Sequence, residues 1–201
     1  ELNYLHDEKI IDRPRKNERG EVVQSLTPAE FTPGIDRLIL NDGRGGATFQ
    51  PISDQPQAAC AGLGIVIGDL DYLPGNEVFV GNDIYANQLW FRRPPANGSG
   101  QPSRWVDEAM LRGCAFAFNG AKTASMGVAA GDFDLNGFVD FHVTNFQNES
   151  VSLFLNQEGS FQDRNVQFAL AQPSLPVLGF GTQAIDYDNN GSLDVVVANG
   201  H

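Results

Sequence analysis

Short hydrophobic runs separated by glycine and acidic residues recur three times along the chain. They cover residues 63–82, 126–145 and 180–199, the second at an offset of 63 from the first and the third at an offset of 54 from the second. Each copy begins with a run of small and aliphatic residues, continues through an acidic loop and ends with a second apolar run. Short runs rich in Val, Ile and Phe, bounded by Gly, Asn and Asp, predict β-strands.

Further strands follow in the first two copies. Third strands are predicted at residues 88–91 and 151–155, and short fourth strands around Trp105 and Phe161. Four strands in about 55–60 residues are typical of one blade of a β-propeller. Helical periodicity is weak, and its best stretch is the short segment 106–112. The pattern therefore predicts an all-β fold built from four-stranded blades.

The repeats also divide the chain. Seven blades of this size would need roughly 420 residues, whereas 201 residues supply about three to three and a half. We therefore expect a partial β-propeller, completed by further sequence or by another chain. The predicted segments are a poorly readable N-terminal part (1–35), the end of one blade (36–53), two blades (54–113 and 114–172) and a truncated blade (173–201).

Two of the loops that follow the first strands share the pattern D-x-D-x-N-G-x-x-D. Oxygen atoms at positions 1, 3, 5 and 9, with the carbonyl of position 7, can converge on one cation, and the glycine permits a sharp turn. Hard oxygen donors suit Ca²⁺, whereas Zn²⁺ prefers His or Cys and Mg²⁺ a stricter octahedron with retained water. The predicted ligands are Asp132, Asp134, Asn136, Phe138 (carbonyl) and Asp140 in one loop, and Asp186, Asp188, Asn190, Ser192 (carbonyl) and Asp194 in the other.

The loop of the first copy departs from this pattern. Its acids are Asp69, Asp71 and Glu77, but position 5 is Leu73, which has no side-chain oxygen, and Pro74 replaces the glycine. A third, weaker calcium site is predicted here, with backbone carbonyls and a bidentate glutamate as ligands. The alternative for all three loops is an Asx-rich turn that binds nothing. Two full copies of the pattern at matching positions favour calcium.

The charge balance supports cation binding by the loops. The chain has 25 acidic and 13 basic residues and a net charge of −12 with neutral histidines. Nine of the acids stand at positions 1, 3 and 9 of the three loops, and without them the net charge would be only −3. The acidity argues against sequence-independent binding to nucleic acid or to anionic membranes. Membrane insertion is not expected either, because no apolar run approaches the ~18 residues that span a bilayer.

The segments Gly-Val-Ala-Ala-Gly-Asp-Phe-Asp at 127–134 and Gly-Phe-Gly-Thr … Val-Ala-Asn-Gly-His at 179–201 resemble FG-GAP/VCBS repeats. The resemblance covers residues 36–201 and is closest to the cartilage acidic protein type, which often carries a UnbV/ASPIC domain. It implies an integrin-α-like β-propeller, usually seven-bladed, with Ca²⁺ in its blade loops. It also implies an extracellular, secreted or cell-surface location. Related propellers serve cell adhesion and glycan binding, so the partner implied is an extracellular protein or a glycan.

Two classes of function remain open. The first is a non-enzymatic, calcium-stabilised extracellular module that binds protein or glycan. The second is the propeller part of a carbohydrate-active enzyme of the lyase or dehydratase type. Such an enzyme would need His, Lys, Tyr or Arg side chains clustered at one mouth of the propeller. The sequence contains no such cluster, no nucleophile elbow and no HExxH motif, which favours the first class.

Five single residues carry separate expectations. His142 is predicted as a partly exposed strand residue and not as a catalytic base, because alternation places it opposite its two apolar neighbours. Cys60 and Cys114 fit either one disulfide or two unrelated buried thiols. Asn97 and Asn148 begin N-x-S sequons. In a secreted eukaryotic chain the first of these, in a Pro/Gly/Ser loop, would be a good glycosylation acceptor.

Overall fold

The computed structural model describes residues 1–2, 15–16, 18–24, 28–95 and 103–200, which form two compact units, 1–61 and 62–201. The sequon at Asn97 lies outside the described residues. Nearly all regular structure is β-strand, as predicted for the fold class. None of the described helices is long or apolar enough to cross a membrane. They are the 3₁₀-helices η2 (Pro28–Glu30) and η3 (Pro56–Ala58) and the α-helices α1 (Ala109–Arg112) and α2 (Ala171–Ser174).

The first unit contains two small antiparallel hairpins. The second hairpin falls in residues 36–53, where the sequence predicts the end of an earlier blade. Its turn is fixed by Asp42, whose carboxylate accepts the N–H groups of Arg44 at 2.7 Å and Gly46 at 2.9 Å. These backbone hydrogen bonds hold the pKa of Asp42 below its usual value. The strands are β1 (Arg15–Lys16) with β2 (Val22–Gln24), and β3 (Arg37–Asn41) with β4 (Ala47–Pro51).

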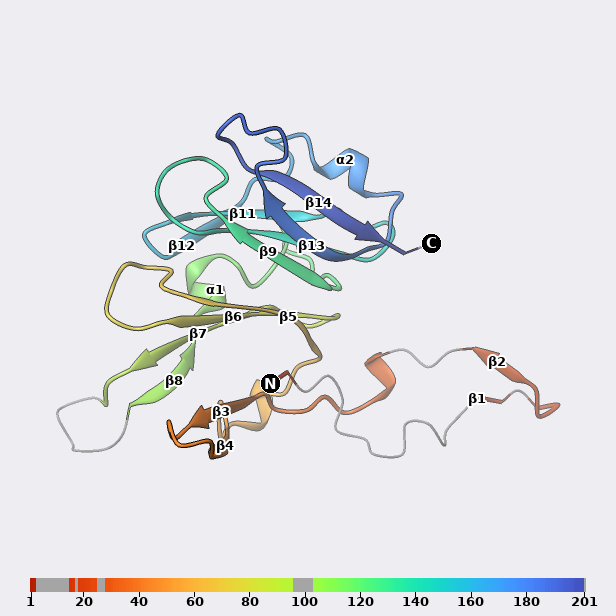
Figure 1. Ribbon diagram of the computed structural model, residues 1–201. Helices are drawn as coiled ribbons and strands as arrows, with labels where there is room; N and C mark the ends of the chain where they lie inside the picture. Colours follow the sequence, from red (N-terminus) through yellow and green to blue (C-terminus); the bar gives the residue numbers. More distant parts are fainter. Residues whose placement is uncertain (3–14, 17, 25–27, 96–102, 201) are drawn as a thin grey trace. The chain divides into compact units, whose positions relative to one another are not determined.

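The second unit contains two complete four-stranded sheets in which each strand pairs with its neighbour in sequence (Figure 1). Every pair is antiparallel. Each sheet is therefore a meander of four consecutive strands, as in a blade of a β-propeller. The short fourth strands expected from the sequence are present. The first sheet is β5 (Gly62–Gly68), β6 (Glu77–Asn82), β7 (Gln88–Arg93) and β8 (Arg104–Asp107); the second is β9 (Gly127–Gly131), β10 (Asp140–Thr144), β11 (Ser152–Gln157) and β12 (Ser160–Asp163).

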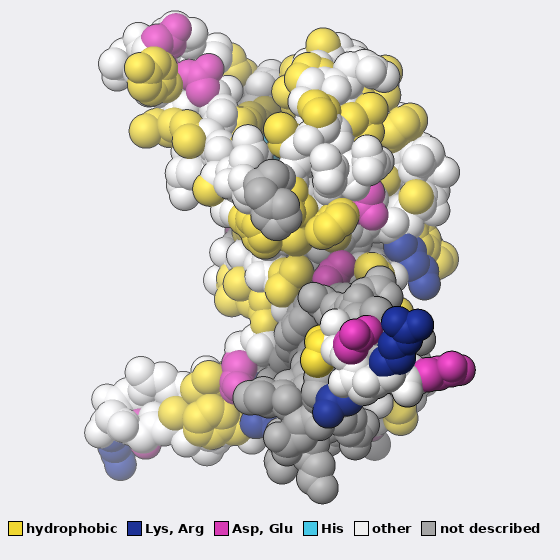
Figure 2. All heavy atoms as spheres, turned by 90° about the vertical axis from the view of Figure 1, so that its right-hand side faces the viewer, with side chains coloured by type: hydrophobic (Ala, Val, Ile, Leu, Met, Phe, Trp, Pro, Cys, Tyr) yellow, Lys and Arg dark blue, Asp and Glu magenta, His cyan; other side chains and the backbone are white. Residues whose placement is uncertain are grey.

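A third sheet of this unit has two strands, β13 (Gly179–Ile185) and β14 (Asp194–Asn199). By its place in the repeat β14 corresponds to β6 and β10, which are buried along their whole length. In β14, by contrast, every residue is exposed or half-buried. Hydrophobic side chains are correspondingly widespread on the upper part of the surface in Figure 2, where β13 and β14 lie. This sheet is the inner half of a blade, so the unit is a partial β-propeller.

The three sheets stack through their first strands, with β5 beside β9 and β9 beside β13 (Figure 1). Glycine at one position of the repeat permits this close approach. A Cβ atom at Gly64 would lie 2.7 Å from Cγ2 of Val128, and one at Gly127 would collide with the carbonyl oxygen of Phe180. The small-residue strands of the sequence are therefore the innermost strands, where neighbouring sheets come closest.

An aromatic core joins the first two sheets. Phe79 on β6 and Phe141 on β10 are fully buried and stack with their ring centroids 4.5 Å apart. Phe161 on β12 stacks on the other side of Phe141 at 4.9 Å. Stacked rings contribute about 0.5–1.5 kcal/mol beyond their buried area. The stacked rings thus come from the second strands of the two sheets and from the fourth strand of the second sheet.

Both cysteines are buried thiols, and neither is half of a disulfide. The structure therefore agrees with the second of the two alternatives for Cys60 and Cys114. Complete burial raises the pKa of the Cys114 thiol, because a thiolate would lose its solvation there. This thiol is accordingly a small core side chain and a poor nucleophile.

The predicted partial exposure of His142 is wrong. As alternation predicts, His142 lies on the face of β10 opposite its two apolar neighbours. However, β13 covers this face, and His142 is only 2% exposed. Its Nδ1 atom lies 3.0 Å from Oγ1 of Thr182. Burial lowers the pKa of His142 to about 4, because the charged imidazolium is poorly solvated between two sheets.

This burial predicts acid sensitivity. Between pH 6.5 and about 4 the unfolded chain binds a proton at His142 that the folded chain does not, so the contribution of His142 should lower stability as the pH falls through this window. The loss should reach the order of 3 kcal/mol at pH 4. His142→Gln keeps a partner for Thr182 but does not titrate. In urea denaturation, the variant should lose less stability than the parent chain between pH 7 and 4.5; equal losses would contradict the assignment.

Candidate metal centre

Three groups of carboxylates gather in the loops between the first and second strands. Within each group, one oxygen atom of each side chain lies within 4.8 Å of the others. Oxygens bound to the same Ca²⁺ at about 2.3–2.6 Å can be at most about 5 Å apart. One cation can therefore be reached by all three members of a group. The groups are Asp69, Asp71 and Glu77; Asp132, Asp134 and Asp140; and Asp186, Asp188 and Asp194.

One backbone hydrogen bond is common to the three loops. The N–H of position 2 donates to the carboxylate of position 9 and so ties the start of each loop to the start of the following strand. This bond orients the last acid toward the two that precede it. The donors and acceptors are Leu70 to Glu77 at 2.8 Å, Phe133 to Asp140 at 2.7 Å, and Tyr187 to Asp194 at 3.0 Å.

The second and third loops also share the hydrogen bonds made by the acid of position 1 and by the asparagine of position 5. The position 1 carboxylate accepts the N–H groups of positions 5 and 6, and the position 5 asparagine accepts the N–H of position 7 through its Oδ1 atom. The carbonyls of Phe138 and Ser192 remain predicted ligands. The bonds are Asn136 and Gly137 to Asp132 (3.0 and 2.8 Å), Phe138 to Asn136 (2.7 Å), Asn190 and Gly191 to Asp186 (both 2.9 Å), and Ser192 to Asn190 (2.8 Å).

The loops turn at two positions, of which the sequence indicates only one. Gly137 and Gly191, at position 6, have φ values of 93° and 89°, as the motif predicts. Position 4 is also left-handed in every loop, although it holds Tyr72, Leu135 and Asn189, with φ values of 57°, 59° and 59°. A left-handed conformation costs a non-glycine residue of the order of 1 kcal/mol. Of the three residues, only Asn189 indicates a left-handed position in the sequence, because asparagine tolerates this region.

The first loop lacks part of this arrangement. Pro74 stands at position 6 and has no N–H to donate to Asp69. The N–H of Leu73 donates to Asp71 at 3.0 Å, but its side chain offers no oxygen. Burial raises the pKa of Glu77, and the neighbouring Asp71 and Asp69 add to this rise, while the Leu70 N–H opposes it. The loop therefore gathers three acids with fewer donors to hold them.

Burial and charge set the chemistry of the second loop. Asp140 is fully buried, and desolvation raises its pKa to about 6, even though the N–H groups of Asn156 and Phe133 stabilise its charged form. The negative charges of Asp134 and Asp132 raise the pKa further. A cation bound among these three carboxylates would remove that repulsion and favour deprotonation.

Asn156, at the end of β11, links the first two loops, and sequence analysis assigns it no role. It is 1% exposed, and its N–H donates to Asp140 at 2.7 Å. Its side-chain amide donates to the carbonyls of Leu70 at 2.8 Å and Val139 at 3.0 Å. Tyr72 adds a second link through its hydroxyl, which donates to the carbonyl of Gly137. The acidic loops of adjacent sheets are thus in direct contact.

A cavity of about 450 Å³ lies at the other end of the second sheet. It is formed by the segment before β9, the turn between β10 and β11 and the helix α2. The side chains on it include Phe118, Lys122, Glu149 and Gln172. Phe118 is 53% exposed. An open aromatic side chain beside amide and charged groups can contact either a sugar ring or a peptide.

A family model matches part of the chain. Residues 132–197 match the model of FG-GAP-like repeats. The matched segment begins at the first aspartate of the second loop, contains the whole third loop and ends within β14. No curated protein is similar enough to count as a match. The part of the chain that carries the two complete acidic motifs is therefore similar to FG-GAP-like repeats, as the sequence resemblance indicates.

Proposed function

We propose that this chain is part of a calcium-binding β-propeller of an extracellular protein that binds a protein or glycan partner. The observation that carries the proposal is the repetition of one hydrogen-bonded scaffold around three carboxylates at the same place in successive sheets. Carboxylates gathered this closely repel each other unless a positive charge stands beside them. The oxygen-only donor set of the second and third loops suits Ca²⁺.

The cation in this proposal is structural. Each loop joins two neighbouring strands of one sheet, so a bound ion would fix the connection between them. Three carboxylates close together repel each other, and a cation that binds only the folded state stabilises that state by mass action. A catalytic metal would more plausibly be single and keep open positions for substrate.

The partner would bind away from the acidic loops. The cavity beside Phe118 and Lys122 lies at the opposite end of the second sheet and combines an exposed aromatic ring with polar side chains. Extracellular location and an adhesive role rest on the resemblance to FG-GAP repeats. A complete propeller also requires further blades, from additional sequence or from another chain.

A calcium titration at several pH values tests the proposal. Since Asp140 must lose its proton to bind the ion and its pKa is raised to about 6, calcium binding at the second loop should weaken as the pH falls below 6. The affinity should change by about tenfold per pH unit there and level off above pH 7. Isothermal titration calorimetry of an Asp186→Asn variant isolates the second loop from the third. Binding of equal strength at pH 5 and pH 7 would contradict the prediction.

A further inference from the structure

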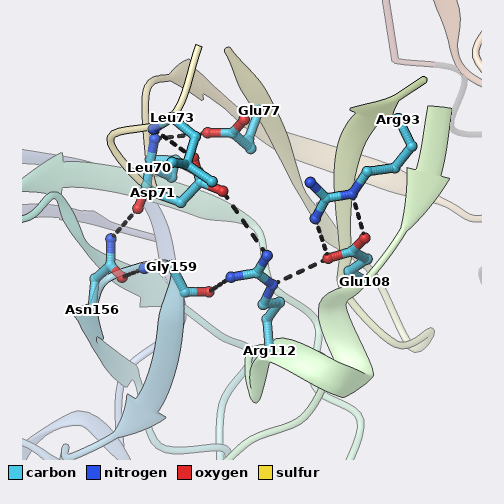
Figure 3. Close-up of polar contacts among 9 residues, drawn as sticks. All are labelled: Leu70, Asp71, Leu73, Glu77, Arg93, Glu108, Arg112, Asn156 and Gly159. Carbon is cyan, nitrogen blue, oxygen red and sulfur yellow. Dashed lines mark hydrogen bonds and ion pairs between the residues drawn. The ribbon is translucent and has the colours of Figure 1, made fainter. Parts of the chain in front are cut away.

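The first acidic loop differs from the others by an arginine that lies beside it. The guanidinium of Arg112, at the end of α1, approaches Asp71 with its NH2 nitrogen 3.9 Å from the Oδ2 oxygen (Figure 3). The Asp71 side chain is only 4% exposed. A carboxylate so well buried needs a partner, because desolvation of an unpaired charge is costly.

Several contacts hold Arg112 in this place. One nitrogen donates to the carbonyl of Gly159, in the β11–β12 turn of the second sheet, at 3.1 Å. Another donates to Glu108 at 3.1 Å, and the guanidinium lies 4.4 Å from the centre of the Phe91 ring. The side chain is therefore fixed by two sheets, and its charge cannot move away from the loop without breaking these contacts.

A second arginine, Arg93, stands near the first loop. Arg93 forms a two-pronged ion pair with Glu108 at 2.7 and 2.6 Å, as Figure 3 shows. Glu108 is thus shared by Arg93 and Arg112, and of these two guanidinium groups it is that of Arg112 that reaches Asp71. The charge of Arg93 also opposes the rise in the pKa of Glu77.

The other two loops have no such neighbour in the part of the chain that the structure describes. The ion pairs Arg93–Glu108, Arg112–Glu108 and Arg112–Asp71 do not reach an acid of the second or third loop. The helix α2, which follows β12 as α1 follows β8, has no basic residue in its last turn. It also packs at the opposite end of its sheet, where the carbonyl of Leu175 accepts the N–H of Asn148 at 2.8 Å.

The geometry points to Arg112 as a fixed cation that takes the place of calcium at the first loop. This inference rests on the proposed function, since it assumes that the other two loops bind Ca²⁺. A side-chain oxygen is missing at Leu73, an N–H is missing at Pro74, and a positive charge already stands beside Asp71. The chain accordingly binds two calcium ions, and its first loop folds without metal.

Counting calcium ions on the full chain tests this inference. Calorimetric titration with CaCl₂ should give two ions for the parent chain. Asp69→Asn should leave two, whereas Asp132→Asn and Asp186→Asn should each leave one. Arg112→Met, which keeps the apolar stem above Phe91, should gain a third ion, and Arg112→Met with Asp69→Asn should return to two. Arg92→Met is the matched control on the exposed side of β7 and should stay at two.

A melting experiment gives a second readout that needs no folded Arg112 variant. Asp71→Asn should lower the melting temperature by the same amount in calcium and in EDTA, since it breaks an ion pair and not a calcium site. Three ions on the parent chain, with one lost in Asp69→Asn, would overturn the inference and leave the proposed function standing. A folded Arg112→Met chain that still binds two ions would overturn it as well. No calcium bound to any loop would overturn both.

Discussion

Chelation of calcium with EDTA is expected to lower the melting temperature of the full chain by about 10–20 °C. At a free calcium concentration of ~100 times Kd, each site stabilises the folded state by about 2.7 kcal/mol, so two sites contribute about 5 kcal/mol. For a chain of this size, 1 kcal/mol corresponds to roughly 2–4 °C. Thermal unfolding followed by circular dichroism, with and without chelator, measures the difference. Equal melting temperatures would contradict a structural role for the cation.

Single substitutions show which loops are responsible for the stabilisation by calcium. Asp134→Ala should lower the melting temperature in calcium by roughly 5–10 °C and lose most of its effect in EDTA, because it removes one ligand of one site. Asp188→Ala should behave in the same way at the third loop. Asp54→Ala, an exposed acid outside the loops, is the control and should be nearly neutral in both conditions.

Phe141→Ala is expected to be the most destabilising single substitution that does not involve calcium. The side chain is fully buried between Phe79 and Phe161, so its removal leaves two rings without their shared partner. Large-to-small changes at such sites cost about 3–5 kcal/mol. Denaturant unfolding should show this loss equally in calcium and in EDTA. Phe118→Ala, at a half-exposed ring, should cost far less, and a similar loss for both variants would argue against a shared aromatic core.

The repeat pattern accounts for most of the fold. The offsets between the three copies place the strands of both complete sheets and the acidic loops, because hydrophobic alternation and turn residues are local properties of the chain. The nine carboxylates of the three clusters all stand at positions 1, 3 and 9 of the loops predicted from the sequence. Even the departure at Leu73 and Pro74 indicated which loop would differ.

Contacts between repeats could not be predicted in this way. His142 is buried because β13 covers it, and Asn156 connects two loops because adjacent sheets stack. Arg112 is the last residue of the short helix α1, 41 residues after Asp71, and has no counterpart in the next repeat. A periodic pattern describes what repeats share, whereas these residues act at the boundary between one repeat and the next. Their roles become visible only when the sheets are packed together.

The left-handed backbone at the fourth position of each acidic loop restricts sequence variation there. Tyr72, Leu135 and Asn189 have little in common in size or polarity, yet none is branched at Cβ. Valine, isoleucine and threonine tolerate this conformation poorly, and proline cannot adopt it. A search pattern for further loops of this kind should therefore define the position by the residues it excludes. Such a pattern accepts all three loops of this chain, whereas one that requires a preferred residue type would reject at least one.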